Sequence, residues 1–221
     1  MKTRFILINT SHAGNVGATA RAMKVMGFDE LYLVAPRWAN VLRREETIQR
    51  SSGAHNVLEN TKIVATLDEA VEGLHHLCAT AMTPRDFGPP TRFPREHFAD
   101  LALRFKAGQN GLVNNETTLE QSTALPPNAG VGFLFGCERY GMSNDDVYRC
   151  DVALQIPTNP QFGSLNLSQA VQVLAYEWRM AIGGFGAESL DGFGQTVTSN
   201  INKLDYCWQH TLWINHFGQL L

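Results

Sequence analysis

Paired cysteines, long hydrophobic runs and an excess of positive charge are all missing from this sequence. Its 221 residues include four cysteines, at positions 78, 137, 150 and 207, with no C-x-x-C pair among them. This spacing fits neither a zinc site nor a disulfide framework, and it indicates a reduced, cytoplasmic protein. No apolar stretch approaches the roughly 18 residues that a membrane span needs, and the apolar run in MKTRFILINT is too short for a signal peptide.

The composition is that of a globular chain, with 44% hydrophobic and 18% charged residues. Disordered, collagen-like and disulfide-dense proteins are excluded by this mixture. The net charge of −3 argues against a protein that coats nucleic acid without specificity. The charge is uneven, however: residues 1–106 hold 14 basic and 11 acidic side chains, and residues 107–221 hold 4 and 10. A polyanion would bind the first half more readily than the second. The alternative is that the charged residues are scattered at random over a solvated surface and the difference between the halves has no function.

Short apolar runs alternate with amphipathic segments, and this order predicts a mostly parallel α/β sheet with helices on both faces. We expect a first domain at residues 1–182 and a helical tail at 183–221, with loops at 83–95 and 107–130. The strands are predicted at 5–8, 31–34, 63–65, 77–80, 131–135 and 152–156. The helices are predicted at 16–26, 41–58, 67–74, about 95–106, 144–149 and 165–182.

The helix predicted at 165–182 is apolar around nearly its whole circumference. A helix that is apolar on all sides is expected to be buried on all sides, whereas a sheet can cover only one of them. We therefore predict a homodimer in which a second subunit covers the other side. The alternative is that the C-terminal tail of the same chain covers it.

A glycine-containing turn follows the first predicted strand, in the segment Asn9 to Arg21. Its G-x-x-G-x-x-A spacing differs from the G-x-G-x-x-G of dinucleotide-binding folds, and no acidic residue ends the next strand. A dinucleotide site is therefore disfavoured. What remains is a helix start suited to an anion, with Asn15 as its cap and Arg21 about a turn and a half further on.

Two later segments also place polar or flexible residues after a buried strand. The first, Leu134-Phe135-Gly136-Cys137-Glu138-Arg139-Tyr140-Gly141, has a glycine that lets backbone approach a ligand and a carboxylate suited to holding a turn. The second runs from Ile156-Pro157 to Ser164-Leu165-Asn166-Leu167, where prolines and a glycine stiffen a loop before a helix. Ser164 and Asn166 also suit simple capping of that helix.

Together these segments resemble the three signature motifs of the SPOUT class of S-adenosylmethionine-dependent RNA methyltransferases, in its SpoU branch of ribose 2′-O-methylases. The resemblance covers residues 4–182. Thr10-Ser11-His12, Arg21-Ala22-Met23-Lys24 and Ala175-Tyr176-Glu177 are most similar to the TrmJ type, which methylates the pyrimidine ribose at position 32 of the tRNA anticodon loop.

The resemblance implies a C-terminal trefoil knot whose loops bind S-adenosylmethionine, and a long C-terminal helix at a dimer interface. It implies no metal. The cofactor-binding residues that it implies are Thr80, Ala81, Met82, Leu134, Phe135, Gly136, Ile156, Ser164, Leu165 and Asn166. Glu138 is expected to have a structural role.

The resemblance also assigns the catalytic role to Arg21, supported by Asn15 and Ser164. A guanidinium stays protonated in proteins and is a poor base, so we expect Arg21 to hold a phosphate and stabilise the developing alkoxide, across the dimer interface if the two subunits meet there. Arg43, Arg44 and Arg85 are the further residues expected to contact RNA.

One motif departs from the TrmJ type, which carries a Ser-Ala-Arg-x-Arg run where this chain has Ala81-Met82-Thr83-Pro84-Arg85. The departure, with the 107–130 excursion, leaves the substrate open. The alternatives are a 2′-O-methyltransferase for ribosomal RNA or another tRNA ribose, and a non-catalytic RNA-binding module on the same fold. A nucleotide-dependent oxidoreductase is a more distant alternative.

Overall fold

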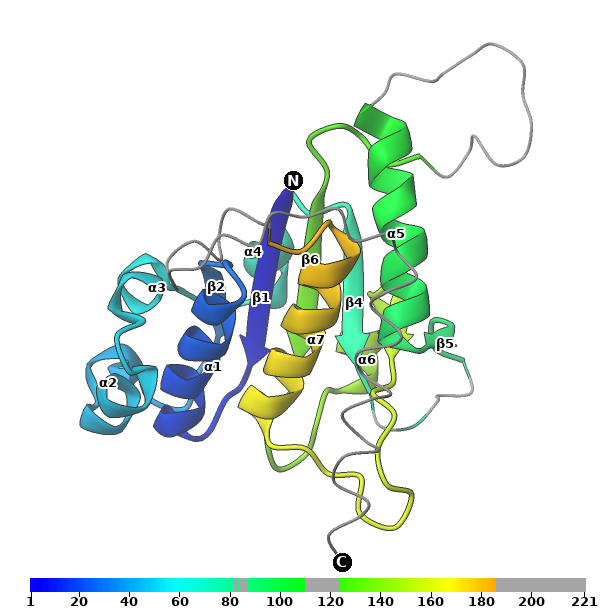
Figure 1. Ribbon diagram of the computed structural model, residues 1–221. Coiled ribbons are helices and arrows are strands. Elements are labelled where there is room, and N and C mark those ends of the chain that lie inside the picture. Colours follow the sequence, from blue (N-terminus) through cyan, green and yellow to red (C-terminus); the bar gives the residue numbers. More distant parts are fainter. Residues whose placement is uncertain (82, 84–86, 110–123, 186–221) are drawn as a thin grey trace, which may run out of the picture. The chain divides into compact units, whose positions relative to one another are not determined.

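The computed structural model describes residues 1–81, 83, 87–109 and 124–185. The chain divides into two units, Met1–Gly184 and Phe185–Leu221, and every described strand belongs to the first unit. These strands form one seven-stranded sheet in the order β3-β2-β1-β6-β4-β7-β5, and all adjacent strands are parallel. The parallel α/β sheet predicted from the sequence is therefore confirmed (Figure 1).

The strands are β1 (Lys2–Ile8), β2 (Glu30–Val34), β3 (Lys62–Val64), β4 (His76–Thr80), β5 (Thr91–Arg92), β6 (Gly130–Phe135) and β7 (Val152–Leu154). The α-helices are α1 (Ala13–Val25), α2 (Glu45–Ser51), α3 (His55–Asn60), α4 (Leu67–Val71), α5 (Pro94–Gln109), α6 (Asn144–Tyr148) and α7 (Leu167–Ala181). A short 3-10 helix, η1, spans Val41–Arg43.

The sheet separates two hydrophobic layers. Because neighbouring strand residues point to opposite faces, Phe5 and Leu7 of β1 join one buried cluster and Ile6 and Ile8 join the other. The first cluster includes residues of α1, α5 and α7, and the second includes residues of α4 and α6. Figure 1 shows α1, α5 and α7 together in front of the sheet, with α4 and α6 behind it. The helices on both faces that the sequence predicted are thus confirmed.

Three predicted elements differ from the structure. Helix α1 begins at Ala13 rather than at residue 16, so Asn15 is inside its first turn and the prediction that Asn15 caps it is wrong. The helix predicted at 41–58 is broken into η1, α2 and α3, with positive φ angles of 44° at Ser52 and 88° at Gly53. The loop predicted at 83–95 contains the short strand β5, which pairs with β7.

Helix α7 is amphipathic within this chain. Its inner face is buried against the sheet and includes Trp178, whose indole N–H donates to the Thr3 hydroxyl at 3.1 Å. On its outer face, Tyr176 is 48% exposed and Met180 is 54% exposed. The expectation that α7 is covered on all sides is therefore not met by the first unit alone. Residues 186–221, the suggested alternative cover, lie outside the described residues.

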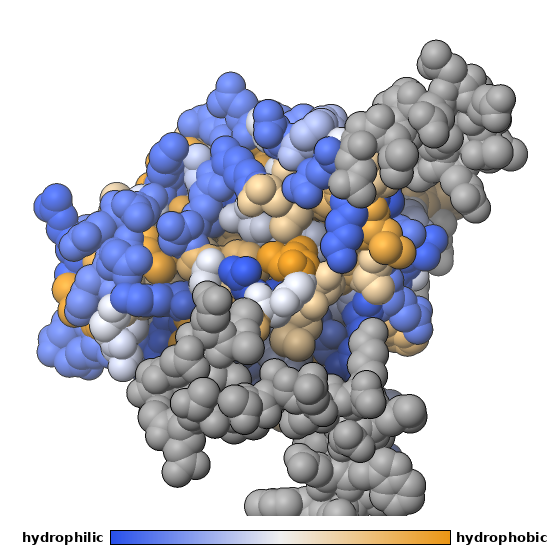
Figure 2. Space-filling model, turned by 45° about the horizontal axis from the view of Figure 1, so that its top comes forward, coloured by the Kyte–Doolittle hydropathy of each residue, from blue (hydrophilic) through white to orange (hydrophobic). Residues whose placement is uncertain are grey.

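The topology indicates that a binding site lies at the carboxyl ends of the parallel strands. Most of the face seen in Figure 2 is hydrophilic, with a small hydrophobic area near its centre. No helix in the described part is long and apolar enough to cross a membrane. Strand β6 lies between β1 and β4. Because these neighbouring strands are parallel, the loops that follow them all leave the sheet at its carboxyl end. Crevices beyond the carboxyl ends of parallel strands are the usual binding places in such folds.

Candidate functional site

Glu138 joins two of the predicted segments. It follows β6, and its carboxylate accepts hydrogen bonds from the loop between β1 and α1. The donors are the Thr10 hydroxyl at 2.8 Å, the Ser11 amide at 2.8 Å and hydroxyl at 2.9 Å, the His12 amide at 3.3 Å and the Asn15 side-chain amide at 3.0 Å. These bonds fix the loop after β1 against the loop after β6.

The same hydrogen bonds determine the charge of Glu138. Burial would raise the pKa of its carboxyl, but the bonds from Asn15, Ser11 and Thr10 outweigh burial and lower the pKa to about 2. Glu138 is therefore ionised at neutral pH, and its two oxygens are already occupied by five donors.

Asn166 connects the third predicted segment to this network. Its side-chain N–H donates to Asn15 Oδ1 at 3.0 Å, and its own Oδ1 accepts from the Ser168 amide at 2.9 Å. Asn166 is the N-cap of α7 and forms a capping box with Gln169. A line of hydrogen bonds thus runs from Glu138 through Asn15 to Asn166, and it brings all three segments together.

A pocket of about 130 Å³ lies beyond β4 and β7, beside the start of α7. Thr80, Ala81, Ile156 and Leu165, all predicted to bind the cofactor, line it. The other lining residues are Leu154, Thr158, Gly163 and Ala170. Thr158 and Gly163 belong to the third predicted segment, whereas Leu154 and Ala170 lie outside all three. Ala170 is three residues after Leu167 and therefore shares a face of the helix with it. This spacing is the signal in the sequence that could have placed Ala170 near the start of the helix that borders the pocket.

Other predicted cofactor residues lie close in sequence but have different surroundings. Leu134 and Phe135 are buried in the two hydrophobic clusters and are not among the described residues that line the pocket. The Leu134 carbonyl accepts a hydrogen bond of 2.5 Å from the Thr80 hydroxyl. Ser164 is exposed between two lining residues. Met82 lies outside the described residues.

Glycines in these segments allow close approach between parts of the chain. A Cβ on Gly136 would collide with the backbone of Gly141 and Met142, where the turn after β6 folds back. The close turn requires a glycine at position 136, and contact of Gly136 with the cofactor stays a prediction. A Cβ on Gly17 would collide with the Thr47 carbonyl, so the spaced glycines of α1 serve helix packing against α2.

The predicted RNA-contacting arginines lie away from this pocket. Arg21 is exposed on α1 and is not among the described residues that line it. Arg43 is exposed at the end of η1, and the Arg44 guanidinium lies 4.4 Å from the centre of the Trp38 ring. The Arg37 guanidinium is 4.8 Å from the same ring. Arg85 lies outside the described residues.

The sequence matches the description "SpoU rRNA Methylase family" over residues 2–176. Two curated relatives are named TrmJ. The tRNA (cytidine/uridine-2′-O-)-methyltransferase of Photorhabdus laumondii is 40% identical over 80% of this chain. The tRNA (cytidine/uridine/adenosine-2′-O-)-methyltransferase of Pseudomonas aeruginosa is 38% identical over 81%. The matches span 64% and 61% of those relatives, so this chain corresponds to less than two thirds of their length.

Solved structures agree with this assignment. A probable methyltransferase from Bordetella pertussis Tohama I is 38% identical, with a TM-score of 0.67 over 82% of this chain and 96% of that one. TrmJ from Z. mobilis ZM4 is 33% identical, with a TM-score of 0.64 over 80% of this chain and 68% of that one. The fold, the joined segments and the sequence matches agree, and the chain belongs to the SpoU methylase family.

Proposed function

We propose that this protein transfers a methyl group from S-adenosylmethionine to a ribose 2′-hydroxyl of tRNA. The observation that carries the proposal is the line of hydrogen bonds from Glu138 through Asn15 to Asn166, which joins the three family segments beside a pocket. The names of the relatives support tRNA as the substrate. We further propose the pyrimidine at position 32 of the anticodon loop as the target and the cytoplasm as the location.

The pocket fits one part of such a cofactor. Its lining is mainly aliphatic, from Leu154, Ile156, Leu165 and Ala170, with the Thr80 and Thr158 hydroxyls as polar groups. A planar adenine needs apolar walls and a few hydrogen-bonding groups, and this lining supplies both. The volume of about 130 Å³ is below the ~300 Å³ of sites that enclose a whole ligand, so we assign the pocket to the base alone.

We also propose that the chain forms the trefoil knot of its family around this pocket. The loops concerned follow β4, β6 and β7, which are adjacent in the sheet. A threaded backbone would hold Thr80, Gly136 and Leu165 at fixed separations. Such rigidity suits a site whose main task is to align two reactants.

The cofactor would supply a methyl group that a positively charged sulfur has already activated. The residues of this chain then need to orient the ribose and stabilise the oxygen as its proton leaves. Glu138 is unsuited to take that proton, because its pKa of about 2 and its five donors leave it a poor base. We assign Arg21 to the substrate phosphate and the developing negative charge, with Asn15 and Ser164 ordering the loops beside the site.

Arg21 would act on the pocket of a second subunit. Arg21 does not line the described pocket of its own chain. Helix α1, which carries Arg21, packs beside α7: Arg179 of α7 donates a hydrogen bond of 2.7 Å to the carbonyl of Met26 at the end of α1. The outer face of α7, which the described part of the first unit leaves exposed, would pair two such units. We therefore propose a homodimer in which each pocket is completed by the other chain.

Two measurements test the reaction. Calorimetry with S-adenosylmethionine measures cofactor binding, and mass-spectrometric mapping of tRNA incubated with enzyme and cofactor locates methylated riboses. We expect binding and one 2′-O-methylated pyrimidine in the anticodon loop. Methylation of ribosomal RNA fragments alone would replace tRNA by ribosomal RNA as the substrate. RNA binding without cofactor binding would identify a non-catalytic module and overturn the proposal.

A mixing experiment tests the role of Arg21 across subunits. We expect Arg21→Ala to abolish transfer while cofactor binding persists, and Ala170→Trp to fill the pocket and abolish both. Co-expression of the two variants restores activity only if Arg21 serves the other subunit's pocket. Lys24→Ala, which removes an exposed cation one turn away on α1, is the matched control and should transfer normally. Normal transfer by Arg21→Ala would refute the catalytic role.

A further inference from the structure

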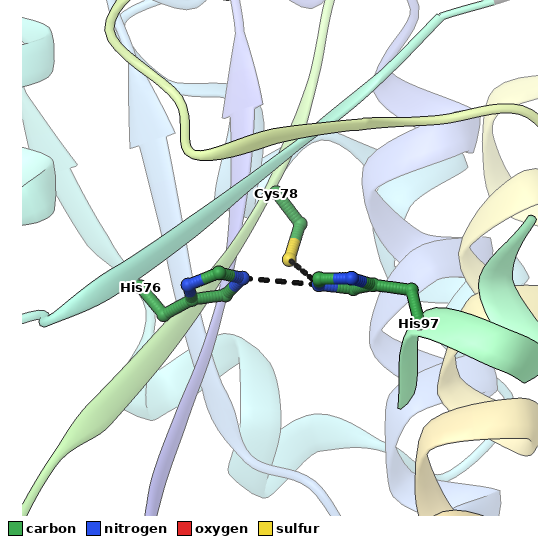
Figure 3. A group of neighbouring side chains, drawn as sticks. All are labelled: His76, Cys78 and His97. Carbon is green, nitrogen blue, oxygen red and sulfur yellow. Dashed lines mark hydrogen bonds between the residues drawn. The ribbon is translucent and has the colours of Figure 1, made fainter. Parts of the chain in front are cut away.

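Three potential metal ligands meet inside the protein, away from the pocket lining. His76 and Cys78 alternate along β4 and so share a face of the sheet, and His97 comes from the first turns of α5 (Figure 3). Their ligand atoms all lie within 4.8 Å of one another. The exposed fractions are 4% for His76, 1% for Cys78 and 5% for His97. The three family segments include none of these residues.

The distances within this group are close to those of a metal site. The two imidazole Nε2 atoms are 3.0 Å apart, and Cys78 Sγ lies 4.0 Å from His97 Nε2. Metal–nitrogen bonds of about 2.05 Å and a metal–sulfur bond of about 2.3 Å at tetrahedral angles give separations of roughly 3.3 and 3.6 Å. The widest separation in the group is within 4.8 Å, so shifts of about an ångström or less would bring all three atoms into coordination.

The surroundings of the group also suit a cation. The other ring nitrogen of His76, Nδ1, lies 3.7 Å from Asp151 Oδ2, and the same oxygen accepts a 2.7 Å hydrogen bond from the Leu77 amide. A carboxylate behind a histidine is the usual outer partner of a metal-bound imidazole, because it orients the ring and raises its basicity. Figure 3 shows a nitrogen-bearing edge of the His76 ring pointing toward the corresponding edge of the His97 ring, with the Cys78 sulfur beside them.

We propose that His76, Cys78 and His97 form a structural site for a thiophilic d10 cation, Zn²⁺ or Cu⁺. Two neutral imidazoles and one thiolate are ligands that such ions share. With Cu⁺ the bound group would have no net charge, and with Zn²⁺ the carboxylate of Asp151 would balance the remaining positive charge. Both arrangements avoid an isolated charge in the core.

The alternative is a hydrogen bond between two neutral histidines, with no ion. Burial lowers the pKa of both His76 and His97, the latter to about 4, so both rings are neutral at pH 7 and one can donate to the other. This arrangement accounts for the 3.0 Å distance and leaves Cys78 as a neutral thiol in a weak contact of 4.0 Å with His97 Nε2. The two possibilities differ in whether the Cys78 sulfur becomes a thiolate bound to an ion.

A bound ion would link both ends of the segment between β4 and α5. Cys78 precedes Thr80 and Ala81, which line the pocket, and His97 lies at the other end of the segment. An ion that binds only the folded protein would stabilise the fold and fix the strand end beside the pocket. The proposed ion is therefore structural, and it takes no part in the methyl transfer.

Cobalt supplies a direct spectroscopic test. The full chain is expressed in cobalt-supplemented minimal medium, so that the ion is present while the protein folds, and its absorption spectrum is recorded. We expect thiolate-to-Co²⁺ charge-transfer bands and d–d bands of a four- or three-coordinate ion. A protein that purifies without these bands and without stoichiometric zinc or copper would overturn the proposal, and this result needs no variant.

Variants then identify the ligands and distinguish the ions. Protein from zinc-supplemented and, in anaerobic preparations, Cu⁺-supplied cells is analysed for metal, with competition by a chelator selective for each ion. We expect about one ion per chain in the native protein and in the Cys150→Ser control, and a loss of about tenfold or more in Cys78→Ser and His97→Gln. Cys150 is a second buried thiol outside the group. Unchanged metal content in Cys78→Ser, with a native circular dichroism spectrum, would refute the site.

Discussion

Asn15 uses both ends of its side-chain amide, and no other described residue links the three family segments in this way. Its N–H donates to Glu138 and its oxygen accepts from Asn166. The sequence alone predicts that Asn15 caps α1, which is the common role of asparagine at a helix start. The helix begins two residues earlier and has no side-chain cap, and the amide is therefore available for long-range bonds. Local preference could not reveal this, because the partners are more than 120 residues away in sequence.

Replacing Glu138 by glutamine tests the network at its centre. The amide keeps the shape but loses the charge and presents donors to groups that already donate, so we expect a loss of about 1–3 kcal/mol in the free energy of unfolding. Urea denaturation monitored by circular dichroism measures this loss. Glu59→Gln, at an exposed position on α3, should change stability by less than about 0.5 kcal/mol. Equal stabilities of the two variants would contradict the role of Glu138.

The depressed pKa of Glu138 also predicts a pH dependence. A carboxyl whose pKa is lowered on folding stabilises the native state above its unfolded pKa of 4.5, and this contribution is lost as the pH falls towards about 2. Allowing for solvent screening, we expect about 1–2 kcal/mol of this kind between pH 4.5 and 2. Urea midpoints measured across this range should fall more steeply for the native protein than for Glu138→Gln. Parallel curves would show that the carboxylate contributes nothing.

At the scale of the element, α1 shows why a glycine spacing can mislead. Gly14 and Gly17 follow a strand, as glycines of a phosphate loop do, but they lie inside the helix and allow α2 to approach. The Thr47 hydroxyl donates to the Ala13 carbonyl at 3.0 Å across this contact. The spacing of three residues fits a helix face, and this feature of the sequence already distinguished the segment from a dinucleotide loop.

Gly17→Ala tests this close approach. The added methyl group would collide with the Thr47 carbonyl, a backbone atom that cannot rotate away. Although alanine favours helix, we expect a net loss of about 1–3 kcal/mol in unfolding free energy, measured by denaturant titration. Val25→Ala, at a 56% exposed position of the same helix, is the control and should be nearly neutral. A Gly17→Ala protein as stable as the native one would show that α2 adjusts freely.

Helix α7 carries the prediction of self-association. Tyr176→Glu combined with Met180→Glu places two charges on its exposed outer face, so we expect dimerisation to weaken at least ~100-fold. Analytical ultracentrifugation measures this change. Leu103→Glu, at a 65% exposed position on α5, is the control and should leave the oligomeric state unchanged. A native protein that sediments as a monomer would remove the proposed dimer altogether.

At the scale of the whole molecule, the order and type of the main elements could be predicted because hydrophobic periodicity reflects burial on either side of a sheet. The strand at 131–135, for example, differs from β6 by one residue at its start. The break at Ser52-Gly53 and the strand β5 were missed, because the first depends on unusual backbone angles and the second on a two-residue pairing with β7. The group formed by His76, Cys78 and His97 depends on contact between two elements, which the spacing of cysteines alone does not express.

The uneven charge of the chain predicts how RNA binding responds to salt. Arg43 and Arg44 lie in the more basic half, so we expect Arg43→Ala with Arg44→Ala to weaken tRNA binding and reduce the slope of log K against log salt by about 1.5–2. Filter-binding titrations at several salt concentrations measure the slope. Arg149→Ala, at the end of α6, removes an arginine paired with Asp68 and should leave the slope unchanged. Identical slopes for the native protein and the double variant would place the RNA elsewhere.

The position of β6 has a consequence for synthesis on the ribosome. Strands β1 and β4 are complete once residue 80 has been made, yet each pairs with β6, which begins at Gly130. Until that strand emerges, β1 lacks its partner on one side, and β4 lacks both of its partners, β6 and β7. Such edges favour pairing with other chains, so the first half is open to misassembly during translation. We therefore expect the centre of the sheet to form only after β6 has been made, and a fragment ending before Gly130 to aggregate.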